Sequence, residues 1–289
     1  MPLQRCCWGT SGLQGGLFSK ASQVAVVRPS SRNNSTIAGL RTRLLEHAAA
    51  GRTAIIETSR EEASYSELLA GADAVACRLH SEPSYTRGGR VAFLAPPGID
   101  YVRTLLGVWQ AGGVAVPLCT THPEEELRYA ITEADACMVA ASGETFVDRL
   151  APIARTEGRA FFALGDATAP SGSSAWLHDS ELAEPALIIF TSGTTGRPKG
   201  VVLTHGNLAA HTASLVDAWG WSHADRILHI LPLHHLHGLG NKLLCALWSG
   251  ASVAFSPPSP REVWARLGRA EEDGLTLFMA VPTNYALLY

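Results

Sequence analysis

Residues 187–205 read LIIFTSGTTGRPKGVVLTH, and this stretch decides the fold. The apolar residues 187–190 predict a strand, a ten-residue loop over 191–200 follows, and residues 201–203 predict a second strand. The loop combines three glycines and three threonines with a serine, an arginine and a lysine. Glycines let backbone N–H groups turn toward one point, hydroxyl groups add donors, and the cations add positive charge. The loop is therefore suited to hold the phosphates of a nucleotide.

This loop is not a Walker A loop, because that motif ends in Gly-Lys-Ser/Thr and runs directly into a helix. Here Pro198 precedes Lys199, and a strand is expected after the loop. A flexible hairpin without a binding role is the alternative. The combination of Thr-Ser-Gly, Thr-Thr-Gly and Arg-Pro-Lys-Gly between two apolar strands argues against it. Such a loop can wrap the β- and γ-phosphates of ATP and stabilise the leaving pyrophosphate.

Upstream of the loop, short apolar runs alternate with helix-length stretches. Strands are expected over residues 53–57, 90–95, 114–118 and 136–141, and helices over residues 64–79, 99–111 and 121–134. Two helix starts fit the capping-box pattern, Ser64 with Glu67 and Thr121 with Glu124. Strands and helices that alternate through short turns predict an α/β fold with a parallel sheet and right-handed crossovers.

The chain is expected to divide into four segments. Residues 1–45 form a leader, 46–164 a first α/β subdomain, 165–184 an exposed connection rich in Ser, Gly, Ala and Pro, and 185–289 a second α/β subdomain that carries the loop.

The leader holds six basic residues and no acidic residue, and Glu46 is the first carboxylate of the chain. This Ser-rich, arginine-containing composition is typical of a mitochondrial transit peptide, and a disordered tail of similar composition is the alternative. A secretory signal fits less well, because no unbroken apolar region follows Arg5. We therefore expect a mitochondrial matrix protein.

Composition excludes several classes of function. The residues after the leader hold 17 Lys or Arg against 26 Asp or Glu, a net charge of about −9 without a basic stripe, which argues against nucleic acid as a partner. No run approaches the 18 or so apolar residues of a transmembrane helix. Six cysteines without a CxxC motif indicate reduced thiols rather than a disulfide framework.

A histidine-rich stretch follows the loop. A helix is expected from residue 205, and a strand over residues 227–233 runs into His234-His235-Leu236-His237-Gly238. A zinc site is disfavoured, because no carboxylate or cysteine lies at ligand spacing, and we expect no metal ligands in this chain. A packing or surface role for His234 is the alternative. Several histidines beside the aliphatic chain of a fatty acid would be buried without hydrogen-bond partners, which costs free energy. The same histidines can donate hydrogen bonds to a second carboxylate of the substrate.

The motif TSGTTGRPKG resembles, at every position, the phosphate-loop signature of the adenylate-forming (AMP-binding) superfamily, which includes the acyl-CoA synthetases. The resemblance implies the N-terminal part of the adenylate-forming ligase fold, with mainly parallel sheets flanked by helices. It also implies that Lys199 and Thr194 are catalytic. The nucleotide contacts that it implies in the loop are Thr191, Ser192, Gly193, Thr194, Thr195, Gly196, Arg197, Pro198 and Lys199.

LPLHHLHG resembles the next motif of the superfamily, in which His235 would border ATP and the acyl pocket and Gly238 would supply the glycine. His234 departs from the phenylalanine that is common there. From about Arg52 to the end, and most strongly over residues 185–285, the chain most resembles acyl-CoA synthetases that activate malonate. This implies a small carboxylic or dicarboxylic acid, malonate or methylmalonate, that reacts with ATP to an acyl-adenylate and then with CoA to a thioester. Medium- or long-chain fatty acids, or a non-catalytic regulatory role, are the alternatives.

The later motifs of the superfamily are not matched in residues 1–289. The glutamate associated with Mg²⁺, the ribose-binding aspartate and the catalytic lysine of the small C-terminal domain are expected beyond this chain. Because metal and oriented charge must act together at the phosphates, we expect the chain alone to be inactive as a ligase.

Overall fold

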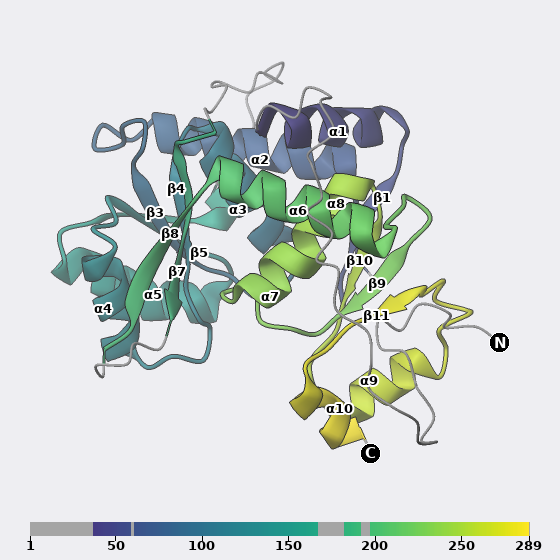
Figure 1. Ribbon diagram of the computed structural model, residues 1–289. Coiled ribbons are helices and arrows are strands. Elements are labelled where there is room, and N and C mark those ends of the chain that lie inside the picture. The colour runs from purple at the N-terminus through teal and green to yellow at the C-terminus, as the bar shows by residue number, and fades with distance from the viewer. Residues whose placement is uncertain (1–36, 59–60, 167–181, 192–196, 289) are drawn as a thin grey trace, which may run out of the picture.

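The computed structural model of the protein describes residues 37–58, 61–166, 182–191 and 197–288. It shows an α/β fold in which two sheets enclose a layer of helices (Figure 1). The fold class expected from the sequence is confirmed.

The larger sheet has six strands in the order β6-β5-β3-β4-β7-β8. Its strands are β3 (Arg90–Leu94), β4 (Val114–Pro117), β5 (Met138–Ala141), β6 (Ala160–Ala163), β7 (Pro185–Thr191) and β8 (Lys199–Thr204). All neighbouring pairs are parallel except β7 and β8, which form the antiparallel hairpin that carries the phosphate loop. The two strands expected around this loop are therefore confirmed.

The smaller sheet has five strands in the order β11-β9-β10-β1-β2. Its strands are β1 (Thr53–Ile56), β2 (Glu62–Ser64), β9 (Arg226–His229), β10 (Ser252–Phe255) and β11 (Leu277–Phe278). β1 lies parallel to β10, with Ile55 opposite Val253. The sheets thus do not follow the expected division of the chain at residues 165–184. The pairing of strands far apart in sequence decides sheet membership, and local patterns do not report it.

The helices form three layers around the sheets. Their bounds are α1 (Ile37–Ala49), α2 (Tyr65–His80), α3 (Ile99–Gln110), α4 (Glu124–Glu133), α5 (Glu144–Thr156), α6 (His205–Trp219), α7 (Leu236–Gly238), α8 (Cys245–Ser249), α9 (Pro260–Leu267) and α10 (Pro282–Leu288). Short 3₁₀ and π segments cover Leu164–Asp166 and Leu239–Leu244. Helices α1, α2, α3, α6 and α8 contribute to the main core between the sheets. Helices α4 and α5 cover the outer face of the larger sheet, and α9 and α10 that of the smaller one (Figure 1).

One of the two predicted capping boxes is confirmed and the other is wrong. At α2, the Glu67 amide donates to Ser64 Oγ at 3.2 Å and the Ser64 amide donates to the Glu67 carboxylate at 2.7 Å. At α4, the N-cap is Pro123 and no side chain caps the helix. The N-cap lies two residues after Thr121 and the helix starts at Glu124, three residues after it, which leaves the threonine outside the first turn.

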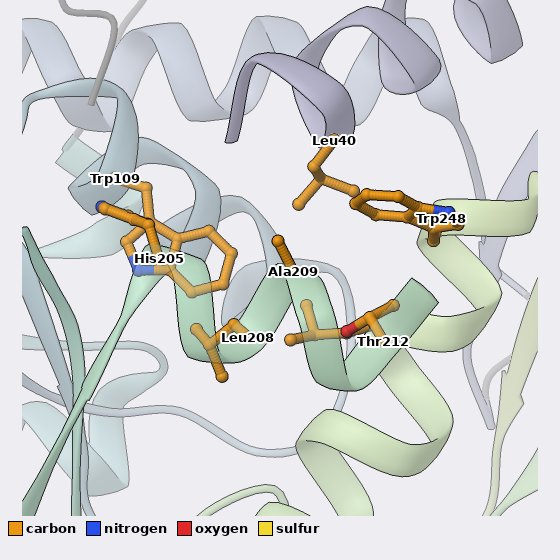
Figure 2. A pocket seen from close by; sticks show the side chains of 8 residues that line it. Leu40, Trp109, His205, Leu208, Ala209, Thr212 and Trp248 are labelled. Atoms are coloured by element: carbon orange, nitrogen blue, oxygen red, sulfur yellow. The ribbon is translucent and has the colours of Figure 1, made fainter. Parts of the chain in front are cut away.

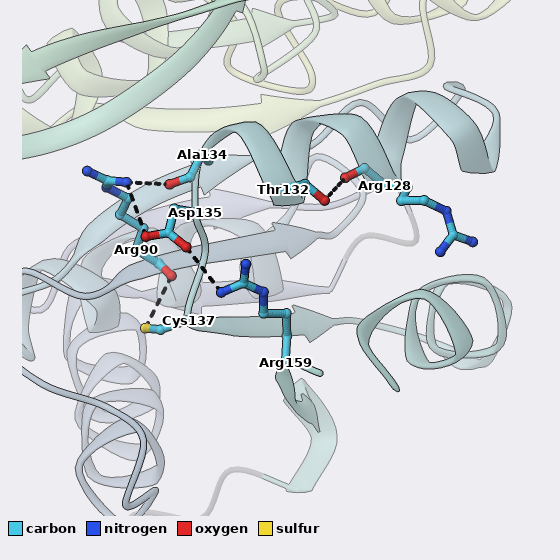
Figure 3. Close-up of polar contacts among 7 residues, drawn as sticks. All are labelled: Arg90, Arg128, Thr132, Ala134, Asp135, Cys137 and Arg159. Atoms are coloured by element: carbon cyan, nitrogen blue, oxygen red, sulfur yellow. Dashed lines mark hydrogen bonds and ion pairs between the residues drawn. The ribbon is translucent and has the colours of Figure 1, made fainter. Parts of the chain in front are cut away.

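The end of α4 is fixed by a corner around Asp135 (Figure 3). Asp135 has a φ of 47°, in the left-handed region. Its carboxylate lies 3.2 Å from Arg159 Nη1 and 3.9 Å from Arg90 Nη1, and Arg90 also donates to the Ala134 carbonyl at 2.8 Å. These contacts fix the turn from α4 into β5.

The helix α1 crosses the boundary expected at residue 45. Leu40 and Leu44 are buried in the main core, so residues assigned to the leader contribute to the folded body. Residues 1–36, and residues 167–181 of the expected connection, lie outside the described residues. No helix in the described part of the chain has the length and apolar character to cross a membrane.

Candidate functional site

The two sheets direct the carboxyl ends of their parallel strands toward one cleft, which we call the strand-end cleft. It has a volume of about 1020 Å³, its opening to solvent included. The residues after five strands contribute to its lining: Thr58 after β1, Ala95 after β3, Leu118 after β4, Ile230 after β9 and Ser256 after β10. Ligands of open α/β sheets bind in crevices at this edge of the strands.

A second cleft, the loop cleft, adjoins the first and has a volume of about 1030 Å³. The hairpin β7–β8 contributes Phe190, Thr191 and Pro198 to its lining. The start of α4 and the histidine stretch after β9 also contribute to its lining. Leu118, Cys119 and His234 line both clefts. The hairpin of the phosphate loop and the histidine stretch therefore border one continuous crevice.

The structure places four of the nine residues expected to contact nucleotide. Thr191 lies opposite Lys199 in the antiparallel pair, at the end of the hairpin where the loop begins and ends. The side chains of Thr191, Arg197 and Lys199 are exposed, and Thr191 and Pro198 line the loop cleft. The expected residues Ser192, Gly193, Thr194, Thr195 and Gly196 lie outside the described residues.

Tyr129 on α4 holds the exit of the loop, and no motif of the sequence predicts this role. Its hydroxyl donates to the Pro198 carbonyl at 2.8 Å. Its ring lies under the guanidinium of Arg197, 5.5 Å from the ring centre, and packs edge-on against Phe190 at 6.3 Å. Tyr129 precedes Pro198 by 69 residues, so no local pattern connects the two.

The histidine stretch forms one wall of the loop cleft. The His234 ring lies 4.2 Å from the His235 ring and 6.0 Å from the ring of His122 on the opposite side. Burial, with smaller contributions from His235 and His122, lowers the pKa of His234 to about 4. Burial also lowers the pKa of His235. At neutral pH His234 is therefore an uncharged hydrogen-bonding group.

His229, at the end of β9, lines the strand-end cleft and is 2% exposed. Its Nε2 donates to the Gly238 carbonyl at 2.9 Å, so the neutral ring has an acceptor at Nδ1, which is buried without a partner among the described residues. Burial lowers the pKa of His229 to about 4. Gly238 is required at this turn because a Cβ there would collide with the Pro232 carbonyl. This explains the glycine that the resemblance places in the motif.

A smaller pocket lies away from these clefts, among α1, α3, α6 and α8 (Figure 2). Its volume is about 310 Å³, and Leu40, Trp109, Leu208 and Trp248 are among the side chains that line it. His205 borders it, packs edge-on against Trp109 at 5.9 Å and has its pKa lowered to about 4 by burial. The pocket is a gap in the helical layer, remote from the strand ends, and we do not assign it to the functional site.

The described residues contain no group of three or more His, Cys, Asp or Glu side chains arranged to hold a metal ion. Glu126 is the one carboxylate among the described residues that line the two clefts.

The sequence model of the AMP-binding enzyme family matches residues 45–289. The chain is 38% identical over 256 residues to the mitochondrial malonate–CoA ligase ACSF3 of Xenopus laevis, which covers 82% of this chain and 43% of that protein. It is 41% identical over 213 residues to the protein of the same name from Homo sapiens, which covers 70% of this chain and 36% of that protein.

Among solved structures, ATP-bound MatB from Rhodopseudomonas palustris superposes with a TM-score of 0.76 at 33% identity. The superposition covers 87% of this chain and 50% of MatB. The chain therefore spans half or less of the length of these relatives.

Proposed function

The chain belongs to the AMP-binding enzyme family, and from this premise we propose that it forms the nucleotide- and acid-binding part of an ATP-dependent acid–thiol ligase. One observation carries the proposal: two residues of TSGTTGRPKG, Thr191 and Pro198, line the same cleft as His235. The two motifs whose resemblance implied nucleotide and acid contact thus border one crevice.

In the proposed reaction, a substrate carboxylate oxygen attacks the α-phosphorus of ATP, and pyrophosphate leaves. The thiolate of CoA then attacks the acyl carbon of the adenylate, and AMP leaves. The exposed Arg197 and Lys199 lie beside the loop and can neutralise phosphate charge as it develops. Mg²⁺ would supply further charge neutralisation, with ligands from elsewhere in a family member.

Malonate or methylmalonate is the proposed acid. The printed names of the relatives support this choice, since several are malonate–CoA ligases. The histidines of the loop cleft support it as well, because polar donors suit a second carboxylate. A fatty acid is the second candidate, favoured by the apolar side chains of Tyr101, Leu233 and Phe255 in the strand-end cleft.

We propose a mitochondrial matrix location with a leader that precedes α1. The acid-free composition of residues 1–36 supports it, as does the word mitochondrial in the names of the vertebrate relatives. The proposed leader ends before α1, because Leu40 and Leu44 belong to the core.

The nucleotide part of the proposal is tested by calorimetric titration of the chain with ATP, and of Lys199→Ala as its variant. We expect the chain to bind ATP and the variant to bind it less tightly, because one of two exposed cations beside the loop is removed. Equal affinity in the two proteins removes Lys199 from the mechanism. No binding to the chain contradicts the proposed nucleotide site.

Catalysis is tested by ATP–pyrophosphate exchange with malonate, methylmalonate, acetate and palmitate. We expect no exchange by the chain alone, because residues 1–289 do not match the later motifs that the resemblance implies for the metal-associated glutamate and the catalytic lysine. Exchange with malonate alone would show that these residues suffice for adenylation, and would contradict the expected inactivity while supporting the acid. Exchange with palmitate alone favours the fatty-acid candidate.

A further inference from the structure

The pocket in the helical layer takes much of its lining from one face of α6 (Figure 2). The lining residues of this helix follow the spacing i, i+3, i+4 and i+7, which places them on one side of it. They are His205, Leu208, Ala209 and Thr212. Leu40 of α1 and Trp248 of α8 line the pocket across from them. We call this space the helix-layer pocket.

Two polar side chains, His205 and Thr212, lie at the two ends of this helix face, and both are 2% exposed. Nδ1 of His205 is buried and has no hydrogen-bond partner among the described residues. Leaving such an atom unpaired costs free energy, so native structures usually supply a partner, often a small bound molecule such as water. The unpaired nitrogen therefore marks a position for a hydrogen-bonding ligand in the pocket.

The size and charge of the helix-layer pocket limit what can bind there. Its volume of about 310 Å³, opening to solvent included, is less than a third of that of either cleft, so it suits a molecule of a few non-hydrogen atoms. No Lys, Arg, Asp or Glu is among the described residues that line it, so an ion would be buried without a counter-charge. A hydroxyl group fits His205, because it can both donate and accept a hydrogen bond, whichever ring nitrogen carries the proton. The ligand class is therefore a short aliphatic alcohol.

The walls of this pocket are bonded to the root of the phosphate-loop hairpin, by which we mean the ends of β7 and β8 remote from the loop. The indole N–H of Trp109 donates to the carbonyl of Ala186, the second residue of β7, at 2.7 Å. The backbone N–H of His205 donates to the carbonyl of Glu184, directly before β7, at 3.0 Å. His205 also follows β8 without an intervening residue. Trp109 and His205 thus fix the root at both strands.

The rings of these two residues also contact each other. The His205 ring packs edge-on against the buried Trp109, with 5.9 Å between the ring centres. A ligand bonded to Nδ1 would hold the His205 ring in this position and so favour the packed form of the root. Because β7 and β8 lead from the root to Thr191 and Lys199, the root supports the two strands that carry the phosphate loop.

We propose that the helix-layer pocket binds a short aliphatic alcohol through His205, and that the bound molecule stabilises the root of the β7–β8 hairpin. Water is the competing occupant, because it also bonds to Nδ1 but covers less of the apolar wall. The pocket lies outside both clefts, so this inference goes beyond the proposed function, and its test requires neither nucleotide nor acid to bind.

The test is a titration of the full ¹⁵N-labelled chain with 1-propanol, followed by NMR at the indole N–H of Trp109. The Trp109→Phe variant identifies this signal by its loss. A ligand this small should bind with a Kd on the order of 1 mM and shift the signal saturably. Acetate, which is of similar size and carries a negative charge, should not shift it.

Amide hydrogen exchange reports on the root of the hairpin. At a concentration of about ten times the Kd, 1-propanol should slow the exchange of the β7 and β8 amides by about tenfold, because the ligand binds only the packed form of the root.

Ala209→Val fills part of the pocket and should abolish both the saturable shift and the slower exchange. Ala265→Val is the matched control, because Ala265 is exposed on α9 and does not line the pocket, and it should respond like the unchanged chain. His205→Phe keeps a ring against Trp109 and removes Nδ1. The affinity for 1-propanol should therefore fall by about two- to tenfold.

Circular dichroism checks the fold of each variant, and His205→Phe decides the test if Ala209→Val does not fold. The absence of a saturable shift in the unchanged chain overturns the site. An unchanged affinity in a folded Ala209→Val or His205→Phe variant places the ligand elsewhere and also overturns it. An equal response to acetate contradicts the uncharged ligand class. Saturable binding with unchanged exchange of β7 and β8 overturns the role at the hairpin root.

Discussion

At the scale of single residues, Tyr129 fixes a loop that it does not belong to. Its hydroxyl holds the Pro198 carbonyl, and its ring supports Arg197. Pro198 has no N–H, so its carbonyl is the backbone group through which the chain can be tied down at that position. The residue after it is Lys199, the cation expected at the phosphates. The position of this lysine therefore depends on α4, a helix that lies far from it in the sequence.

Tyr129→Phe should loosen the loop exit while the ring contact with Arg197 remains. A hydrogen bond of this kind contributes about 0.5–1.5 kcal/mol, so ATP affinity should fall by roughly two- to tenfold. Amide hydrogen exchange of the first residues of β8 should become faster. Tyr85→Phe is the control, since its hydroxyl donates to the Ala111 carbonyl at 3.2 Å, far from the hairpin. Equal exchange rates in β8 for both variants contradict the role of Tyr129.

His229 should make stability depend on pH. Its pKa is lowered to about 4 in the fold, so below its ordinary pKa of about 6.5 the unfolded chain binds a proton that the folded chain does not. The contribution of His229 to the free energy of unfolding is complete above about pH 6.5 and is lost as the pH falls toward 4. Between these pH values His229 lowers the free energy of unfolding by about 1.4 kcal/mol per pH unit.

Urea unfolding at a series of pH values measures this loss. His205 and His234, whose pKa values are also lowered to about 4, add to the slope. His229→Gln keeps an N–H that can reach the Gly238 carbonyl and does not titrate. This variant should therefore make the free energy of unfolding depend less steeply on pH below about 6.5. An unchanged pH dependence contradicts the lowered pKa of His229.

At the scale of elements, the sequence predicts well where the signal is local. The strands β1, β3, β4 and β5 and the helices α2, α3 and α6 lie within a few residues of their expected places. The helices α1 and α5 were not anticipated, because α1 was assigned to the leader and α5 follows a strand without a side-chain cap. Thr121 and Glu124 are residue types that form capping boxes, but the prediction is wrong because the helix has Pro123 as its N-cap and starts at Glu124.

Ser64→Ala and Thr121→Ala should differ in their effect on stability. Ser64 caps α2 and its loss should cost about 1 kcal/mol of the free energy of unfolding. Thr121 caps nothing and is exposed, so its loss should stay within about 0.5 kcal/mol. Equilibrium unfolding in urea compares the two, and equal losses would contradict the helix start at Glu124.

At the scale of the whole molecule, the two sheets share one core. Its buried residues come from both sheets, among them Ile55 and Val253 of the smaller and Val91 and Phe93 of the larger. Polar contacts cross the same region: the Tyr101 hydroxyl donates to the Leu233 carbonyl at 2.8 Å.

The sequence predicted strands and loops of the site. It could not predict which strands share a sheet, nor that His122 and Tyr129 meet the motifs, since these contacts join residues far apart in the sequence.

A shared core predicts that both sheets unfold together. Circular dichroism and tryptophan fluorescence should give coincident urea transitions. Tyr101→Phe leaves the buried Leu233 carbonyl without its donor and should lower the free energy of unfolding by about 1–3 kcal/mol. The whole transition should move to lower urea. Two separate transitions, in either protein, would show that the sheets are independent folding units.

The parallel pairing of β1 with β10 has a consequence for the newborn chain. Ile55 leaves the ribosome about 200 residues before its partner Val253. At a usual synthesis rate of about 5–20 residues per second, roughly 10–40 s pass before β10 is made. Over that interval the inner edge of β1 stays unpaired with its apolar side chains uncovered, which is the situation in which chaperones bind nascent chains. The smaller sheet is therefore completed late, and the strand-end cleft with it.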